Sequence, residues 1–185
     1  PYLPEYAITA LISALQDDSS DLRKLVAEVL GSQSSLPEYA VTALVALLND
    51  EVSDIRVLAV KALGCQYTLP EYAVVAIVSS LKDGNPEVRR SAVNALGQDS
   101  SILEYAVTAV ISSFQDEDED VRRLAADAIA AQSTLSESAI TALVATLQSQ
   151  YSDSRRFTIE ILGKRPSLQE YVIIAIIGSF QDEDE

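Results

Sequence analysis

Five arginines recur every 33 residues, and their side chains have the clearest capacity for specific bonding in this sequence. They are Arg23, Arg56, Arg89, Arg122 and Arg155. A guanidinium carries five N–H donors in a planar fork that matches a carboxylate or a phosphate. A row of such groups binds either an anionic ligand or acids of the protein itself.

Aspartates stand in register with these arginines, six residues before them. The register holds in the first four places and fails in the fifth, where Ser149 replaces the acid. Because the acids are in phase, we interpret the arginines as a structural ladder of charge-assisted hydrogen bonds. We expect Arg155, which follows Ser149, to lack its usual partner. The predicted ladder consists of Asp17, Arg23, Asp50, Arg56, Asp83, Arg89, Asp116, Arg122 and Arg155, and Asp182 falls on the same column.

Few residues are available for catalysis. The chain has no histidine, which excludes a Ser-His-Asp triad, an imidazole base and a histidine-ligated metal. Cys65 is the single cysteine and follows a glycine at the end of a predicted helix, so we interpret it as an ordinary thiol. There is no glycine-rich phosphate loop. The sequence therefore predicts a protein without enzyme activity, metal or cofactor.

One acidic run matches part of a calcium-binding loop. Asp116, Asp118, Asp120 and Asp127 fall at positions one, three, five and twelve of an EF-hand count. Position six is Val121, where that loop requires glycine, and two arginines follow at once. We interpret the run as an acidic helix start that complements the helix dipole.

The ladder residues lie in a repeat of 33 residues that has no insertion or deletion. Its opening string, Leu3-Pro4-Glu5-Tyr6-Ala7, returns in similar copies along the chain. A fixed period of this length is typical of a solenoid. The sequence predicts a single array over residues 1–185, with full repeats 3–35, 36–68, 69–101, 102–134 and 135–167 and a half repeat 168–185.

Each repeat is predicted to form two helices. The first begins with a capping box, as in Ser35 with Glu38, and in two repeats Pro37 and Pro70 lie in its first turn. The same box occurs at Thr68, Ser101, Thr134 and Ser167. The second helix begins at a capping residue such as Ser19, Asn85 or Asp118. We expect it to end at a left-handed glycine, as at Gly31, Gly64, Gly97 and Gly163.

These motifs carry a family resemblance over the whole chain. The strings Asp83-Gly84-Asn85-Pro86-Glu87-Val88-Arg89-Arg90 and Ala95-Leu96-Gly97 resemble HEAT-like repeats of the phycobilisome-lyase type. The Leu-Pro-Glu-Tyr-Ala opening resembles the repeat arrays of some fungal NACHT-containing receptors. The resemblance implies an all-α, right-handed α-solenoid of stacked two-helix repeats with eleven helices.

The charge balance narrows the class of partner. The net charge is -15, which disfavours nucleic acid as a partner, because affinity for nucleic acid depends on lysine and arginine side chains at its phosphates. No apolar run is long enough for a transmembrane helix, so we expect no membrane partner. A single thiol without a disulfide framework favours a cytoplasmic setting. The absence of methionine indicates a fragment of a larger protein.

The predicted binding surface lies on the second helices, which resemble the lining of a concave surface in HEAT-like arrays. Side chains predicted to be exposed there vary between repeats while the buried columns hold steady. We therefore predict a non-catalytic scaffold for a protein or peptide partner. The alternatives are a ligand-sensing domain of a multidomain NTPase receptor and a phycobilin lyase-type subunit. The predicted partner-binding residues are Lys24, Val57, Lys61, Arg90, Arg123 and Arg156.

The sequence makes specific predictions for two other surfaces. The tyrosine column Tyr6, Tyr39, Tyr72, Tyr105 and Tyr171 is either a recognition stripe or a packing column between first helices, and we interpret it as packing. The terminal half repeat is expected to expose Ile173, Ile176, Ile177 and Phe180, which predicts end-to-end self-association.

Overall fold

The computed structural model describes residues 3–98, 103–165 and 169–179. These residues form eleven α-helices and one short 3-10 helix, and they contain no β-strand. The helices alternate in pairs with the predicted period, so the all-α fold is confirmed. The chain divides into two compact units, residues 1–98 and 99–185, which are described separately. The single array over residues 1–185 stays a prediction.

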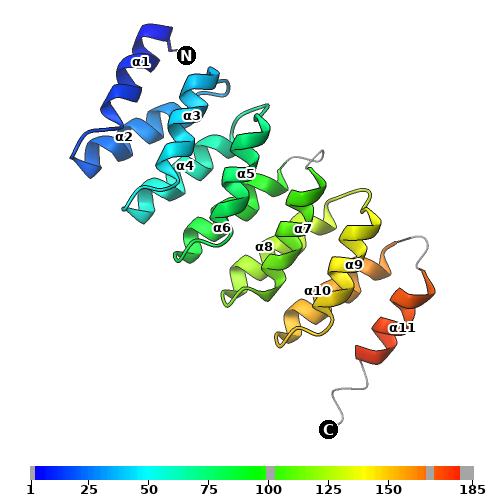
Figure 1. The fold of residues 1–185 in the computed structure, drawn as a ribbon. Helices are drawn as coiled ribbons and strands as arrows, with labels where there is room; N and C mark the ends of the chain where they lie inside the picture. Colours follow the sequence, from blue (N-terminus) through cyan, green and yellow to red (C-terminus); the bar gives the residue numbers. More distant parts are fainter. Residues whose placement is uncertain (1–2, 99–102, 166–168, 180–185) are drawn as a thin grey trace. The chain divides into compact units, whose positions relative to one another are not determined.

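The N-terminal unit contains three helix pairs. Its first helices are α1 (Glu5–Ala14), α3 (Glu38–Leu47) and α5 (Glu71–Ser80). Its second helices are α2 (Ser20–Gly31), α4 (Ser53–Gly64) and α6 (Pro86–Gly97). Helices of the same kind lie side by side, and each first helix packs on the second helix of its pair (Figure 1).

The C-terminal unit repeats this arrangement. Its first helices are α7 (Glu104–Ser112), which the 3-10 turn η1 (Ser113–Gln115) extends, α9 (Glu137–Thr146) and α11 (Glu170–Ser179). Its second helices are α8 (Glu119–Ala130) and α10 (Ser152–Gly163), which contact each other. Four residues with predicted roles lie outside the described residues: Ser101, Ser167, Phe180 and Asp182.

Aliphatic side chains fill the space between the two helix layers. In the N-terminal unit Leu30, Leu44, Ile55 and Leu63 are fully buried. Helices of ten to twelve residues are marginal alone in water, so burial against neighbouring helices supplies their stability. Each such side chain contributes roughly 1.5–3 kcal/mol.

The first helices begin two residues later than the capping boxes predicted. The N-cap residue of α3 is Pro37, and the helix has no side-chain cap bond. The carbonyl of Pro37 accepts the first helical bond from the N–H of Ala40 at 2.9 Å. A residue before proline is disfavoured in helical conformation, so Leu36 cannot belong to the helix and Ser35 cannot cap it. The predicted cap Thr68 is wrong in the same way, since Pro70 takes that position. The predicted cap Thr134 is wrong for another reason, because Ser136 caps α9 with a hydroxyl that accepts the N–H of Ala139 at 3.2 Å.

The predicted starts of the second helices are confirmed. The side chain of Asn85 accepts the N–H of Glu87 at 2.8 Å, and Pro86 is the first helical residue. Proline fits there because its missing N–H would have no partner in the helix. Ser19 and Asp118 cap α2 and α8 through side-chain acceptors.

The glycines at the second-helix ends are not left-handed caps, because no described glycine has a positive φ. They are the last helical residues of their helices. A Cβ added to Gly64 would lie 2.7 Å from the Cβ of Ala95, and one added to Gly31 would lie 3.0 Å from the Cβ of Ala62. These two glycines therefore allow close approach of α4 to α6 and of α2 to α4.

Candidate functional site

A charged ladder joins successive repeats of the N-terminal unit. Arg23 on α2 donates to both carboxylate oxygens of Asp50, from Nε at 2.8 Å and from Nη2 at 3.1 Å. Its Nη1 donates to the backbone carbonyls of Asp17 and Asp18 at 3.0 and 3.2 Å. One arginine thus fixes the turn of its own repeat and the turn of the next repeat.

The same bonds recur one repeat later. Arg56 donates to the carboxylate of Asp83 at 2.7 and 2.9 Å, and to the carbonyl of Asp50 at 2.9 Å. Each carboxylate also accepts a backbone N–H two residues further along the chain. The bonds from Arg23 and Arg56 hold the pKa values of Asp50 and Asp83 below their ordinary value. The same bonds raise the pKa values of the two arginines.

The remaining ladder residues bond the turns of their own repeats. The carboxylate of Asp17 accepts the N–H of Ser19 at 2.8 Å. Arg89 donates to the carbonyl of Asp83 at 2.9 Å. In the C-terminal unit the carboxylate of Asp116 accepts the N–H of Asp118 at 2.9 Å, and Arg155 donates to the carbonyl of Ser149 at 2.8 Å.

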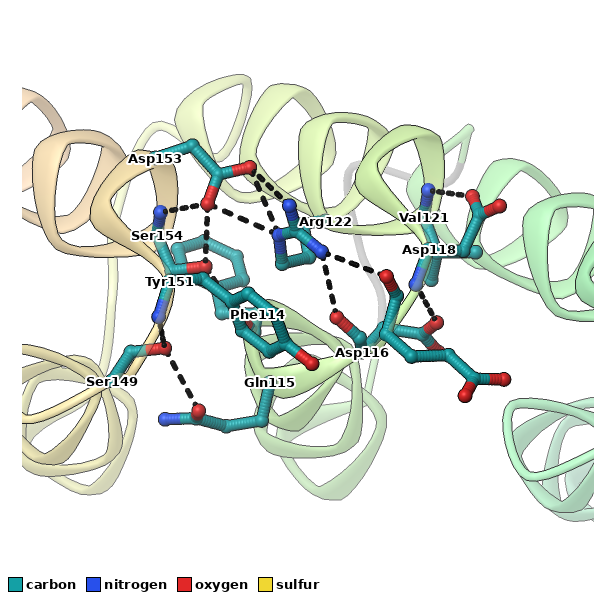
Figure 2. A network of polar contacts seen from close by, with 11 residues as sticks. Phe114, Gln115, Asp116, Asp118, Val121, Arg122, Ser149, Tyr151, Asp153 and Ser154 are labelled. Carbon is teal, nitrogen blue, oxygen red and sulfur yellow. Dashed lines mark hydrogen bonds and ion pairs between the residues drawn. The ribbon is translucent and has the colours of Figure 1, made fainter.

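The ladder is rebuilt where Ser149 replaces the aspartate. Arg122 on α8 donates from Nε to Asp153 at 2.9 Å, and its Nη2 lies 2.7 Å from the same carboxylate (Figure 2). The ring of Tyr151 lies 4.1 Å from the guanidinium carbon of Arg122. In this ladder an arginine bonds the acid of the following repeat, so Ser149 removes the acid that Arg122 would otherwise bond. The expectation that it would deprive Arg155 of a partner is wrong.

The carboxylate of Asp153 has taken over the ladder position. Burial raises its pKa, but the bonds from Arg122 and from the N–H of Ser154 outweigh burial, and the pKa lies below its ordinary value. The fully buried hydroxyl of Ser154 donates to the carbonyl of Phe114 at 2.6 Å. The hydroxyl of Ser149 donates to the side chain of Gln115 at 2.9 Å (Figure 2). Polar bonds therefore attach α10 to the preceding repeat.

We define the second-helix face as the exposed side of the second helices within each unit. In the N-terminal unit it carries Lys24, Lys61 and Arg90 from the predicted set. The Nζ of Lys24 lies 3.1 Å from Asp54, and that of Lys61 lies 4.0 Å from Glu87, each on the following second helix. Arg90 also lies within 3.3 Å of Glu87, on its own helix.

Val57 does not belong to this face. Its side chain is buried, with 8% exposed, although the sequence predicted it as exposed. The helix that carries it, α4, has α2 and α6 as neighbours. Lys24 and Arg90 hold the equivalent position in other repeats, and their long side chains carry a charged group to solvent, which valine cannot do.

In the C-terminal unit the face carries Arg123 and Arg156. The side chain of Arg123 is 54% exposed and lies 3.0 Å from Asp120 on the same helix. The side chain of Arg156 is 65% exposed and lies 3.7 Å from Glu160, also on its own helix. Its guanidinium lies over the ring of Phe157, 5.2 Å from the centroid.

A second set of cross-repeat bonds was not predicted. The side chain of Gln66 accepts the N–H of Leu36 at 2.9 Å and donates to the carbonyl of Gln33 at 3.0 Å. In the C-terminal unit Arg165 takes this position and donates to the carbonyl of Gln132 at 3.1 Å. The signal was present in the sequence, because glutamines at 33, 66 and 132 stand in register.

The tyrosine column lies on the first helices, where four of its five side chains are 39–40% exposed. Tyr72 is 40% exposed, and its hydroxyl lies 3.0 Å from that of Thr42 on α3. Tyr6 on α1 is 78% exposed. The contact of Tyr72 with the preceding first helix agrees with a packing role.

Metal binding and membrane crossing each require a particular grouping of side chains. No group of three or more acidic or cysteine side chains comes together in the described part of the chain as a metal site. None of the described helices is long and apolar enough to cross a membrane. The acidic run begins a helix, since Asp118 caps α8 by accepting the N–H of Val121 at 3.0 Å.

A comparison of this sequence with known families agrees with the repeat motif and the ladder. The model for HEAT repeats matches residues 8–77 and 74–163. The chain belongs to the HEAT repeat family. No curated protein matches the sequence of this HEAT repeat chain.

Solved structures share the solenoid fold of HEAT and armadillo repeats. An engineered protein has a TM-score of 0.63 at 23% identity, over 96% of this chain and 86% of that chain. A designed armadillo repeat protein in complex with the peptide (KR)4 has a TM-score of 0.58 at 18% identity, over 95% and 81%. Computationally designed armadillo repeat proteins for modular peptide recognition give 0.62 at 15% identity, over 94% and 88%. At these identities the likeness concerns the fold.

Proposed function

We propose that this HEAT repeat chain is a non-catalytic scaffold that binds a protein or peptide partner on its second-helix face. One observation carries the proposal. Cross-repeat bonds such as Arg23–Asp50 and Arg56–Asp83 keep the helices in register, while the side chains of the face change from repeat to repeat. A constant frame with a changing exposed set suits recognition of an extended segment.

The fold supports the same class of function. Two structures of this fold are designed armadillo repeat proteins, one in complex with the peptide (KR)4 and one made for modular peptide recognition. Successive second helices are spaced by roughly 10 Å, so a segment that contacts several repeats must be extended. The receptor and lyase alternatives stay predictions from the sequence.

The test uses a random peptide library panned on the chain. Peptides selected on the chain should lose most of their affinity for the triple variant Arg90→Ser, Arg123→Ser and Arg156→Ser. The matched control is Thr42→Glu, Val75→Glu and Thr141→Glu on exposed first-helix positions, which makes the same change in net charge. Equal loss in both variants, with helical circular dichroism intact, would place the binding surface elsewhere.

A further inference from the structure

An acid occupies the first turn of every described second helix. In the N-terminal unit two of these acids stay on the second-helix face. The side chain of Asp54 is 66% exposed where it meets Lys24, and that of Glu87 is 52% exposed where it meets Lys61. Each acid therefore neutralises a base of the preceding second helix.

The acid of α10 is withdrawn from this face. Asp153 is the residue equivalent to Asp54 and Glu87, but its side chain is only 19% exposed and it bonds Arg122. The cause is Ser149, which stands in the ladder position and has no carboxylate to offer Arg122. The negative charge that lies on the surface in α4 and α6 therefore lies in the ladder in α10.

The withdrawal changes the surroundings of Arg123, which holds the position of Lys24. Lys24 bonds the acid of the next second helix, whereas Arg123 pairs with Asp120 in its own helix. Arg156 also pairs within its helix. Exposed pairs three or four residues apart are weak, so carboxylates from another molecule can displace them.

We infer that an acidic, extended segment of the partner binds across α8 and α10, with its carboxylates bonding Arg123 and Arg156. Ser149 leaves this place open, because it has no carboxylate for Arg122 and Asp153 bonds Arg122 instead. The inference rests on the proposed function and specifies its partner. Phe157 holds the guanidinium of Arg156 along the surface, which reduces the freedom lost when a carboxylate binds. The net charge of -15 repels an acidic segment mainly at low salt, because the screening length is about 8 Å at physiological ionic strength.

The experiment measures binding of two fluorescein-labelled octapeptides by anisotropy, one of alternating glutamate and serine and one of alternating lysine and serine. The first variant, Ser149→Asp, restores the ladder acid and so returns Asp153 to the face. Its matched control is Gln150→Glu, which adds the same charge in the same turn at an exposed position. The second variant, Arg123→Gln with Arg156→Gln, removes the proposed contacts directly and alters only exposed side chains.

We expect the glutamate peptide to bind the unaltered chain. Ser149→Asp should weaken it about three- to tenfold and Gln150→Glu less than about twofold, because exposed charges contribute little singly. The double arginine variant should weaken it about tenfold or more. Equal effects of Ser149→Asp and Gln150→Glu would overturn the role of Ser149. Absence of binding by the glutamate peptide would overturn the inference that the partner segment is acidic. The proposed function would still be tested separately, by the peptides selected by panning.

Discussion

Arg122 and Asp153 are joined across α8 and α10 by the same planar fork that joins Arg23 to Asp50 in the N-terminal unit. In the C-terminal unit the acid lies in the first turn of α10, whereas in the N-terminal unit it lies in the turn that precedes the second helix. Arg122 still donates to the carbonyl of Asp116 at 2.9 Å, as Arg23 does to Asp17. The arginine is thus the constant part of the ladder, and the acid can come from either of two places.

We therefore expect the arginines to stabilise the fold. Arg56→Ala should lower the free energy of unfolding by about 2–4 kcal/mol, because it leaves the carboxylate of Asp83 and the backbone carbonyls of Asp50 and Glu51 without their donor. The control is Lys61→Ala on the same helix, which should change it by less than about 0.5 kcal/mol since its pair is exposed. Urea unfolding followed by circular dichroism measures both. Equal midpoints for the two variants would contradict a structural role.

The depressed pKa values of Asp50 and Asp83 predict loss of stability in acid. A carboxyl whose pKa is lower in the folded state stabilises the protein above its unfolded pKa, about 3.9 for aspartate. This contribution disappears as the pH falls through that value towards the folded pKa. Melting temperatures of the unaltered chain should therefore fall steeply below about pH 4.

The variant Asp83→Asn isolates this effect from the general loss of negative charge in acid. It should be less stable than the unaltered chain at neutral pH, and the difference between the two should shrink as the pH falls below about 4. A stability difference that stays constant from neutral pH to acid would show that the Asp83 carboxylate has the same pKa in both states.

The close helix contact at Gly64 gives a third prediction. Gly64→Ala should destabilise the chain by about 1–3 kcal/mol, because the new methyl group would overlap the Cβ of Ala95. Gly163→Ala is the matched control, since a Cβ there meets nothing within 4 Å. It should be neutral or stabilising by up to about 1 kcal/mol, because alanine is the better helix former. Thermal unfolding of the two variants decides the matter, and equal melting temperatures would argue against a packing role for Gly64.

Periodicity predicted much of the fold. The spacing of apolar residues and the caps at Ser19, Asn85 and Asp118 located the helix pairs, because these signals are local. The first-helix starts were placed too early, since the effect of proline on the preceding Leu36 competed with the capping box at Ser35 and prevailed. The glycine prediction failed because a helix-ending glycine serves both a left-handed turn and a close contact. Only the position of Ala95 in space distinguishes the two.

The candidate site was less predictable for a similar reason. Arginine and aspartate in register are six residues apart within a repeat and 27 apart between repeats, and a periodic sequence does not distinguish these pairings. The structure shows that Arg23 bonds the Asp17 turn through its carbonyl and Asp50 through its carboxylate. Replacement of the ladder acid by Asp153 depends on the reach of a side chain in α10, which no sequence pattern expresses.

The last prediction concerns α11, which exposes two apolar positions that are buried or only partly accessible in the other described first helices. Ile173 and Ile177 are 45% and 55% exposed, whereas none of the equivalent residues in the other first helices is exposed, and the most buried of them, Val41 and Ile111, are at 3% and 1%. Exposed apolar groups of this kind favour association, so we expect copies of the 185-residue chain to associate through this face. The variant Ile173→Glu with Ile177→Glu should shift the sedimentation coefficient at high concentration to that of a monomer.

Ile174→Glu on the same helix is the control for that experiment. Ile174 is 62% exposed, and its equivalent Val75 is also exposed, at 47%, although α5 has a second helix packed on it. A glutamate at this position should leave association unchanged, because the side chain lies on the side that repeats leave in solvent. Sedimentation of the unaltered chain as a monomer at every concentration, or equal effects of the double variant and of Ile174→Glu, would show that the Ile173 and Ile177 surface does not drive association.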